Sequence, residues 1–138
     1  MGYLNFKSEY DRFPVINIKK HDDHVYEGFT PIIEKLKSIE KGVICFETYP
    51  GINLDILRDN IIKELNPDQL IFIEDYTKST KDINLMLDKN LTDDRVFGTY
   101  SYHKIYDFYQ LDKIKALNKR IDKDKKTVVY GFGASLIN

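Results

Sequence analysis

The sequence has no excess of charge, only one cysteine and no apolar run long enough to cross a bilayer. Its 21 basic and 22 acidic residues give a net charge of −1, which argues against a nucleic-acid-binding surface. Cys45 has no partner for an intrachain disulfide, which fits a reducing compartment. Residues 128–137 form the longest largely apolar run, too short for a transmembrane helix. We therefore expect a soluble cytoplasmic protein that binds neither nucleic acid nor membrane.

Nothing in the sequence indicates more than one folded unit. A chain of 138 residues can bury roughly two thirds of its unfolded surface in a single core. No internal repeat or low-complexity linker interrupts it. The chain stops just after a predicted strand and a glycine turn, where an α/β fold would add a helix. We expect residues 1–138 to be one α/β domain and the N-terminal part of a longer protein.

Residues 43–57 contain the pattern around which the fold is predicted. An apolar run begins at Val43, a Pro50-Gly51 turn follows, and a helix over residues 54–65 is predicted next, with Asn53 as its cap. Strand, glycine turn and helix form the unit that places ligands at the carboxyl ends of parallel strands. We expect residues 43–48 to be the central strand of the sheet.

Further strands and helices alternate along the chain. Apolar runs predict strands at 13–18, 70–73 and 127–130, and the run at 70–73 is typical of a strand buried on both faces. Apolar residues at helical spacing predict helices over 32–39, 83–91 and 108–117. Such alternation predicts a mainly parallel sheet with helices on both faces, a three-layer α-β-α fold.

A nucleotide-binding P-loop is poorly matched at the glycine turn. The motif requires Gly-x-x-x-x-Gly-Lys-Ser/Thr, in which backbone amides and the lysine hold phosphates. When the motif is aligned on Gly51, this sequence has Phe46 in place of the first glycine, Ile52 in place of the lysine and Asn53 in place of the serine or threonine. Asp55, in the first helical turn, would also repel a phosphate. The chain path resembles a P-loop, but the phosphate-binding chemistry does not.

Acidic residues follow two of the predicted strands. Glu47, Glu74 and Asp75 are expected at the carboxyl edge, where they would converge with Asp93 and Asp94. Several carboxylates on one rim would suit Mg²⁺ or a polar substrate. In the simpler alternative, Asp93 caps a turn and Asp94 pairs with a neighbouring arginine. The pair His21 and His24 would suit a metal only with further ligands, so no metal site is predicted.

Arg95 is the candidate contact for a phosphate or carboxylate, because its planar guanidinium binds such groups bidentately. A structural ion pair is the alternative role. Gly131 and Gly133 would let the backbone approach a ligand, and Tyr49 would line the same rim. The predicted ligand-binding residues are Tyr49, Gly51, Asn53, Asp75, Asp93, Asp94, Arg95, Gly131 and Gly133.

Four segments resemble a known family. They are Tyr-Pro-Gly-Ile-Asn (49–53), Leu-Thr-Asp-Asp-Arg-Val-Phe-Gly (91–98), Asp-Phe (107–108) and Val-Tyr-Gly-Phe-Gly-Ala (129–134). Together they resemble the N-terminal region of bacterial class I mannose-6-phosphate isomerase-like proteins, in which a P-loop-kinase-like α/β region precedes a zinc-dependent cupin isomerase domain. The resemblance covers roughly residues 10–137 and implies a P-loop-kinase-like or Rossmann-like fold.

The resemblance places the chain in sugar-phosphate metabolism but does not make it an isomerase. The cupin with its metal ligands is absent here, so zinc would belong to that missing domain and this chain alone is predicted to be inactive. The expected role is an accessory or regulatory domain that binds a sugar phosphate or nucleotide and accompanies the cupin domain. A kinase-like phosphotransferase with a degenerate P-loop and a pure oligomerisation or interaction module are the alternatives. A homo-oligomer is compatible with each of these three roles.

Overall fold

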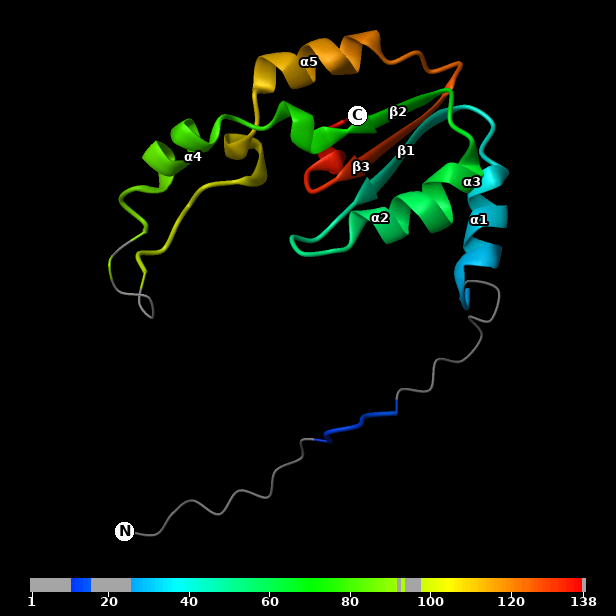
Figure 1. Cartoon of the computed structure of the whole chain (residues 1–138), viewed down its shortest axis with the longest axis horizontal. Helices are drawn as coiled ribbons and strands as arrows, with labels where there is room; N and C mark the ends of the chain where they lie inside the picture. Colours follow the sequence, from blue (N-terminus) through cyan, green and yellow to red (C-terminus); the bar gives the residue numbers. More distant parts are fainter. Residues whose placement is uncertain (1–10, 16–25, 92, 94–97, 138) are drawn as a thin grey trace.

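The computed structural model describes residues 11–15, 26–91, 93 and 98–137 as a mixed α/β fold (Figure 1). Its helices are α1 (Phe29–Lys37), α2 (Leu54–Leu57), α3 (Lys63–Leu65), α4 (Thr80–Leu87) and α5 (Leu111–Arg120). Its strands are β1 (Gly42–Glu47), β2 (Gln69–Phe72) and β3 (Lys126–Gly131). A π-helical turn (Arg58–Ile62) joins α2 to α3, and 3-10 turns lie at Ile73–Tyr76, Ile105–Phe108 and Ala134–Leu136. No helix in these ranges is both long and apolar enough to cross a membrane.

The three strands form a parallel sheet in the order β1-β3-β2. Val128 of β3 lies opposite Ile44 of β1 on one side and Leu70 of β2 on the other. Thr127, Val128 and Val129 are completely buried, as expected of a central strand rich in β-branched residues. The prediction that residues 43–48 form the central strand is therefore wrong, since β1 lies at an edge.

The sheet order explains why helices cover both faces. The chain passes from β1 across β3 to β2, and then reverses direction to return to β3. Right-handed crossovers in opposite directions place their helices on opposite faces of the sheet. Accordingly, Ile61, Ile62 and Leu65 pack with Ile44 and Val128 on one face. On the other face, Ile114 and Leu117 of α5 pack with Ile71 and Val129 (Figure 1).

The helical stretch from Leu54 to Leu65 agrees with its prediction. Asn53 caps it, and its side-chain oxygen accepts hydrogen bonds from the amides of Asp55 and Ile56. The π-helical turn changes the spacing of the apolar stripe, and both Ile61 and Ile62 are buried. Asn66 ends the stretch in the left-handed conformation, with φ of 44°.

One predicted strand and one predicted helix differ from the structure, and a second predicted strand lies only partly within the described residues. The run at 70–73 does not form a strand buried on both faces, because β2 is an edge strand and Leu70 is 46% exposed. For the strand at 13–18, only 13–15 lie within the described residues, and there Phe13 and Val15 are exposed without strand pairing. Helix α4 is present, but none of its residues is buried, and it projects away from the sheet (Figure 1).

Candidate functional site

Two glutamates at the carboxyl edge bind the backbone that follows β3. We call residues 131–135 the C-terminal turn. The carboxylate of Glu47, at the end of β1, accepts hydrogen bonds from the amides of Gly133 at 2.5 Å and Ser135 at 2.7 Å. Glu74, just after β2, accepts one from the amide of Phe132 at 3.1 Å. The two side chains therefore fix the C-terminal turn to the ends of both edge strands.

Tyr109 holds the same turn from the side of α5. Its buried hydroxyl donates a hydrogen bond to the carbonyl of Phe132. Burial and the nearby carboxylates of Glu74 and Glu47 raise the pKa of Tyr109 to about 12, so the phenol keeps its proton at neutral pH. The backbone of Gly133 packs against the Tyr109 ring, where a Cβ would lie only 2.7 Å from ring atoms. Close packing at this position therefore requires glycine.

The C-terminal turn resembles an anion-binding loop, but the chain fills it with its own carboxylate. Amides that would bind a ligand phosphate donate instead to Glu47 and Glu74. Gly131 is buried between Phe72, Ile73 and Glu74, and Gly133 faces Tyr109. In this conformation the two predicted glycines serve internal packing, and the open space of the site lies next to the turn.

That space is a pocket of about 330 Å³ at the carboxyl edge of the sheet. Tyr49, 80% exposed, and Phe132, 37% exposed, contribute aromatic rings, and Glu74 contributes its carboxylate. The remaining lining residues are Thr48, Pro50, Gly51, Ile52 and Leu54. Two predicted site residues, Tyr49 and Gly51, thus come together with Glu74. Phe132 was not predicted to line the site, because the sequence does not show where the C-terminal turn folds back.

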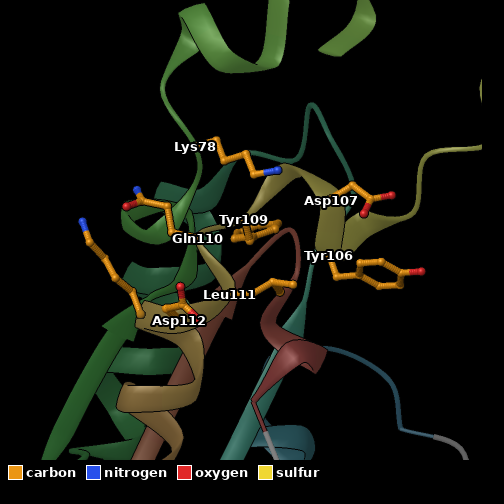
Figure 2. A pocket seen from close by; sticks show the side chains of 8 residues that line it. Lys78, Tyr106, Asp107, Tyr109, Gln110, Leu111 and Asp112 are labelled. Atoms are coloured by element: carbon orange, nitrogen blue, oxygen red, sulfur yellow. The ribbon is translucent and has the colours of Figure 1, made fainter. Parts of the chain in front are cut away.

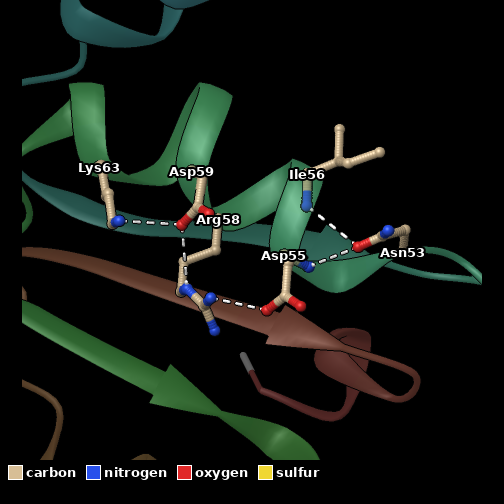
Figure 3. A network of polar contacts seen from close by, with 6 residues as sticks. All are labelled: Asn53, Asp55, Ile56, Arg58, Asp59 and Lys63. Carbon is tan, nitrogen blue, oxygen red and sulfur yellow. Dashed lines mark hydrogen bonds and ion pairs between the residues drawn. The ribbon is translucent and has the colours of Figure 1, made fainter.

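Asn53 lies beside this pocket but has a structural role. Its side-chain oxygen is used in capping α2 (Figure 3). Arg58, in the following turn, is paired with Asp55 at 2.6 Å and Asp59 at 3.3 Å, and Lys63 also contacts Asp59. The charged groups at this helix start are therefore engaged with one another. This arrangement disfavours a nucleotide phosphate at the start of α2, where Asp55 already interacts with the helix dipole.

The remaining predicted residues are not gathered at the pocket. Asp75 is exposed on the 3-10 turn after β2, and Asp93 is exposed. Asp94 and Arg95 lie outside the described residues, as do His21 and His24. Across the described ranges, no cluster of three or more His, Cys, Asp or Glu side chains could hold a metal ion.

A second pocket, of about 490 Å³, contains none of the predicted residues. Figure 2 shows Lys78 above the Tyr109 ring, with Tyr106 and Asp107 on one side and Gln110 on the other. It forms where the chain after β2 pairs with the segment before α5, through bonds such as Gln110 N to Tyr76 O at 2.9 Å. Two lysines and two aspartates balance in charge along its lining. No sequence motif indicated this pairing.

The Glu47 contact predicts a specific loss of acid stability. Burial raises the pKa of Glu47, but hydrogen bonds from Gly133 and Ser135 outweigh it and lower the pKa below its ordinary value. The carboxylate therefore stabilises the fold above about pH 4.5. This stability is lost as the pH falls through the lowered folded-state pKa. At pH 7, Glu47→Gln should cost only about 1–2 kcal/mol, since Glu47 is exposed to solvent, although both amides lose a charged acceptor and one of them loses its acceptor altogether.

Urea unfolding between pH 7 and pH 3 tests this expectation. The variant should lose less stability on acidification than the wild type, so that the difference between the two shrinks as the pH falls below about 4.5. Glu64→Gln is the matched control, because Glu64 forms only an exposed ion pair with Lys37. The control should change stability by less than about 0.5 kcal/mol. Equal effects of the two substitutions at pH 7 would show that the Glu47 hydrogen bonds add nothing to the fold.

Comparison with known proteins gives one match. No curated protein and no solved structure matches the chain. A family model described as a domain of unknown function, DUF8485, matches residues 28–138, which include every helix and strand of the structure. The chain, with its three-stranded parallel sheet and its pocket at the carboxyl edge, therefore belongs to the DUF8485 family.

Proposed function

We propose that this chain is a non-catalytic ligand-binding domain that takes a sugar phosphate at the carboxyl edge of its sheet and accompanies a mannose-6-phosphate isomerase. The observation that carries the binding role is the pocket in which Tyr49 and Phe132 lie with the carboxylate of Glu74. Ligands of open parallel sheets bind at this edge. The sugar-phosphate and isomerase parts of the proposal rest on the sequence resemblance.

The pocket lining suits the sugar part of such a ligand. The exposed ring of Tyr49 offers an apolar face to the C–H groups of a sugar ring. One oxygen of Glu74 is held by the Phe132 amide, and among the described residues the other has no hydrogen-bond partner. A fixed carboxylate with a free oxygen accepts hydrogen bonds from sugar hydroxyls. A mainly apolar pocket with one oriented polar group is typical of small-molecule sites.

The phosphate would lie outside the pocket. Among the described residues, the lining contains the negative charge of Glu74 and no basic residue, so these residues would repel a phosphate within the pocket. Arg95 lies outside the described residues, and it is proposed as the phosphate contact from its sequence context alone. The proposal thus assigns the sugar to the pocket and the phosphate to Arg95. Separate substitutions can remove the sugar contact and the phosphate contact.

We also infer a reduced P-loop-kinase-like or Rossmann-like fold. Three parallel strands, helices on both faces and a glycine turn between β1 and α2 support it. Phosphoryl transfer is disfavoured because Asn53 occupies the amides of Asp55 and Ile56 and the motif lysine is replaced by Ile52. Binding without turnover is therefore the expected activity of this chain.

Thermal unfolding with a panel of ligands tests the proposal. The panel contains mannose 6-phosphate, fructose 6-phosphate, the unphosphorylated sugars, inorganic phosphate, ATP and GTP. A sugar phosphate present at 100 times its dissociation constant should stabilise the fold by about 2.7 kcal/mol. Inorganic phosphate should give no comparable shift, because it cannot use the aromatic pocket.

Matched variants locate the binding. Tyr49→Ala should remove the ligand-induced shift, whereas Tyr102→Ala, at a tyrosine that is 86% exposed outside the pocket, should leave it unchanged. Arg95→Ala should remove the preference for phosphorylated sugars over their parent sugars. A flat response to the whole panel would favour the interaction module, and hydrolysis of ATP or GTP would favour the phosphotransferase.

A further inference from the structure

The larger pocket, beside Tyr109, contains two opposite charges that do not pair with each other. Lys78 and Asp107 both line it, and Figure 2 shows the Lys78 nitrogen above the Tyr109 ring on the side where Asp107 lies. Among the described residues, the Lys78 side chain forms no hydrogen bond or ion pair. Both residues are half-buried, whereas Asp112 and Lys113, the other charged residues of the lining, are exposed. Solvent therefore screens the charges of Lys78 and Asp107 least.

Hydrogen bonds hold both residues in place at the pocket. The amide of Lys78 donates to the carbonyl of Phe108 at 2.9 Å, which fixes the start of the lysine side chain. Oδ2 of Asp107 accepts a hydrogen bond from the amide of Lys104 at 2.8 Å. Within the described ranges, Oδ1 of Asp107 has no hydrogen-bond partner. An ammonium group on a flexible stem and an oriented carboxylate oxygen are thus both available to a ligand.

The pocket also offers apolar surface next to these charges. Tyr106 is 46% exposed and Leu111 is 41% exposed, and both line the pocket. The pocket volume of about 490 Å³ lies within the range of about 300–1,000 Å³ that is typical of small-molecule sites. A ligand that fits this lining has one negative group, one positive group and an apolar part.

We propose that this pocket binds a free α-amino acid with an apolar side chain, such as phenylalanine. The carboxylate of the amino acid contacts Lys78, and its ammonium group donates a hydrogen bond to Oδ1 of Asp107. Its side chain covers the exposed faces of Tyr106 and Leu111. A simple anion would be repelled by Asp107 and a simple cation by Lys78, so the lining favours a zwitterion over either.

The amino-acid site is independent of the proposed sugar-phosphate site. The lining of this pocket and the lining of the carboxyl-edge pocket have no residue in common. Tyr49→Ala should therefore leave amino-acid binding unchanged. A protein that binds the amino acid but no sugar phosphate would refute only the proposed function, and the reverse result would refute only the amino-acid site.

A matched set of ligands tests the chemistry in the full chain. Phenylalanine, 3-phenylpropionate, which lacks the ammonium group, and phenethylamine, which lacks the carboxylate, would be titrated into ¹⁵N-labelled protein. Phenylalanine should give saturable shifts at the amides of Lys78, Gln110 and Leu111. Each analogue should bind about tenfold more weakly, because it loses one charged contact. Equal affinity for phenylalanine and either analogue, or no saturable shift with phenylalanine at millimolar concentration, would overturn the proposal.

Substitutions test the assigned contacts. Lys78→Gln should raise the dissociation constant of phenylalanine about tenfold without weakening the binding of phenethylamine. Asp107→Asn, which keeps an acceptor for the Lys104 amide, should have the same effect on phenylalanine without weakening the binding of 3-phenylpropionate. Lys81→Gln is the control, because Lys81 is an exposed lysine of α4 outside this pocket. Equal losses with Lys78→Gln and Lys81→Gln would overturn the assignment of Lys78 to the carboxylate.

Discussion

Val128→Asp is expected to abolish cooperative folding. Val128 is completely buried in the central strand and contacts the core formed with Ile44, Ile62 and Leu65. A carboxylate there would have no described cation beside it, and an unpaired buried charge costs several kcal/mol. Domains of this size have a total stability of about 5–15 kcal/mol. Circular dichroism should therefore show loss of the folded spectrum and of the thermal transition.

Leu70→Asp is the matched control for this result. Leu70 is the direct neighbour of Val128 in the sheet, but it is 46% exposed because β2 is an edge strand. Its carboxylate can remain in water, so the variant should keep a cooperative transition. Equal unfolding by both substitutions would contradict the assignment of β3 as the centre and β2 as an edge.

Gly133→Ala should destabilise the domain by about 3 kcal/mol without abolishing folding. The residue has a φ of 100°, which a side chain disfavours by about 1–2 kcal/mol. The added methyl would also lie 2.7 Å from the ring of Tyr109, which cannot move away without losing its hydrogen bond to Phe132. Overpacking of this kind adds about 1–3 kcal/mol. Urea unfolding monitored by tyrosine fluorescence measures the total loss in the free energy of unfolding.

Gly51→Ala separates the two contributions. Gly51 has a similar φ of 93°, but a Cβ there would meet nothing within 4 Å. The variant should therefore show only the backbone cost, about 1–2 kcal/mol. If Gly133→Ala cost no more than Gly51→Ala, the close packing of Tyr109 on the C-terminal turn would not be present in solution.

The sequence predicts the elements of this fold better than their arrangement. The apolar stripe of residues 54–65 and the glycine turn before it are local patterns, and both agree with the structure. Strand order is not local. The runs 43–46 and 70–73 are as apolar as a central strand, yet two of the three strands that the described residues form must be edges. An apolar run alone cannot show which strand has neighbours on both sides.

The same contrast between local pattern and long-range arrangement holds for the candidate site. Glu47 and Glu74 were expected at the strand ends, and they lie there. Their partners are backbone amides of the C-terminal turn, separated from Glu47 by 86 residues in the case of Gly133. No side-chain pattern marks such a contact, because the donors are backbone groups. The larger pocket beside Lys78 was missed for a related reason, since it depends on main-chain pairing between Thr77 and Tyr109.

The most direct test of the proposed site is to map ligand binding residue by residue. A sugar phosphate, the same sugar and inorganic phosphate would each be titrated into ¹⁵N-labelled protein while the backbone amide signals are followed. The proposal predicts saturable shifts for the sugar phosphate at Gly51, Ile52 and Phe132, which line the carboxyl-edge pocket. Shifts centred instead on Lys78, Leu111 and Asp112, or no saturable shift with any ligand, would contradict it.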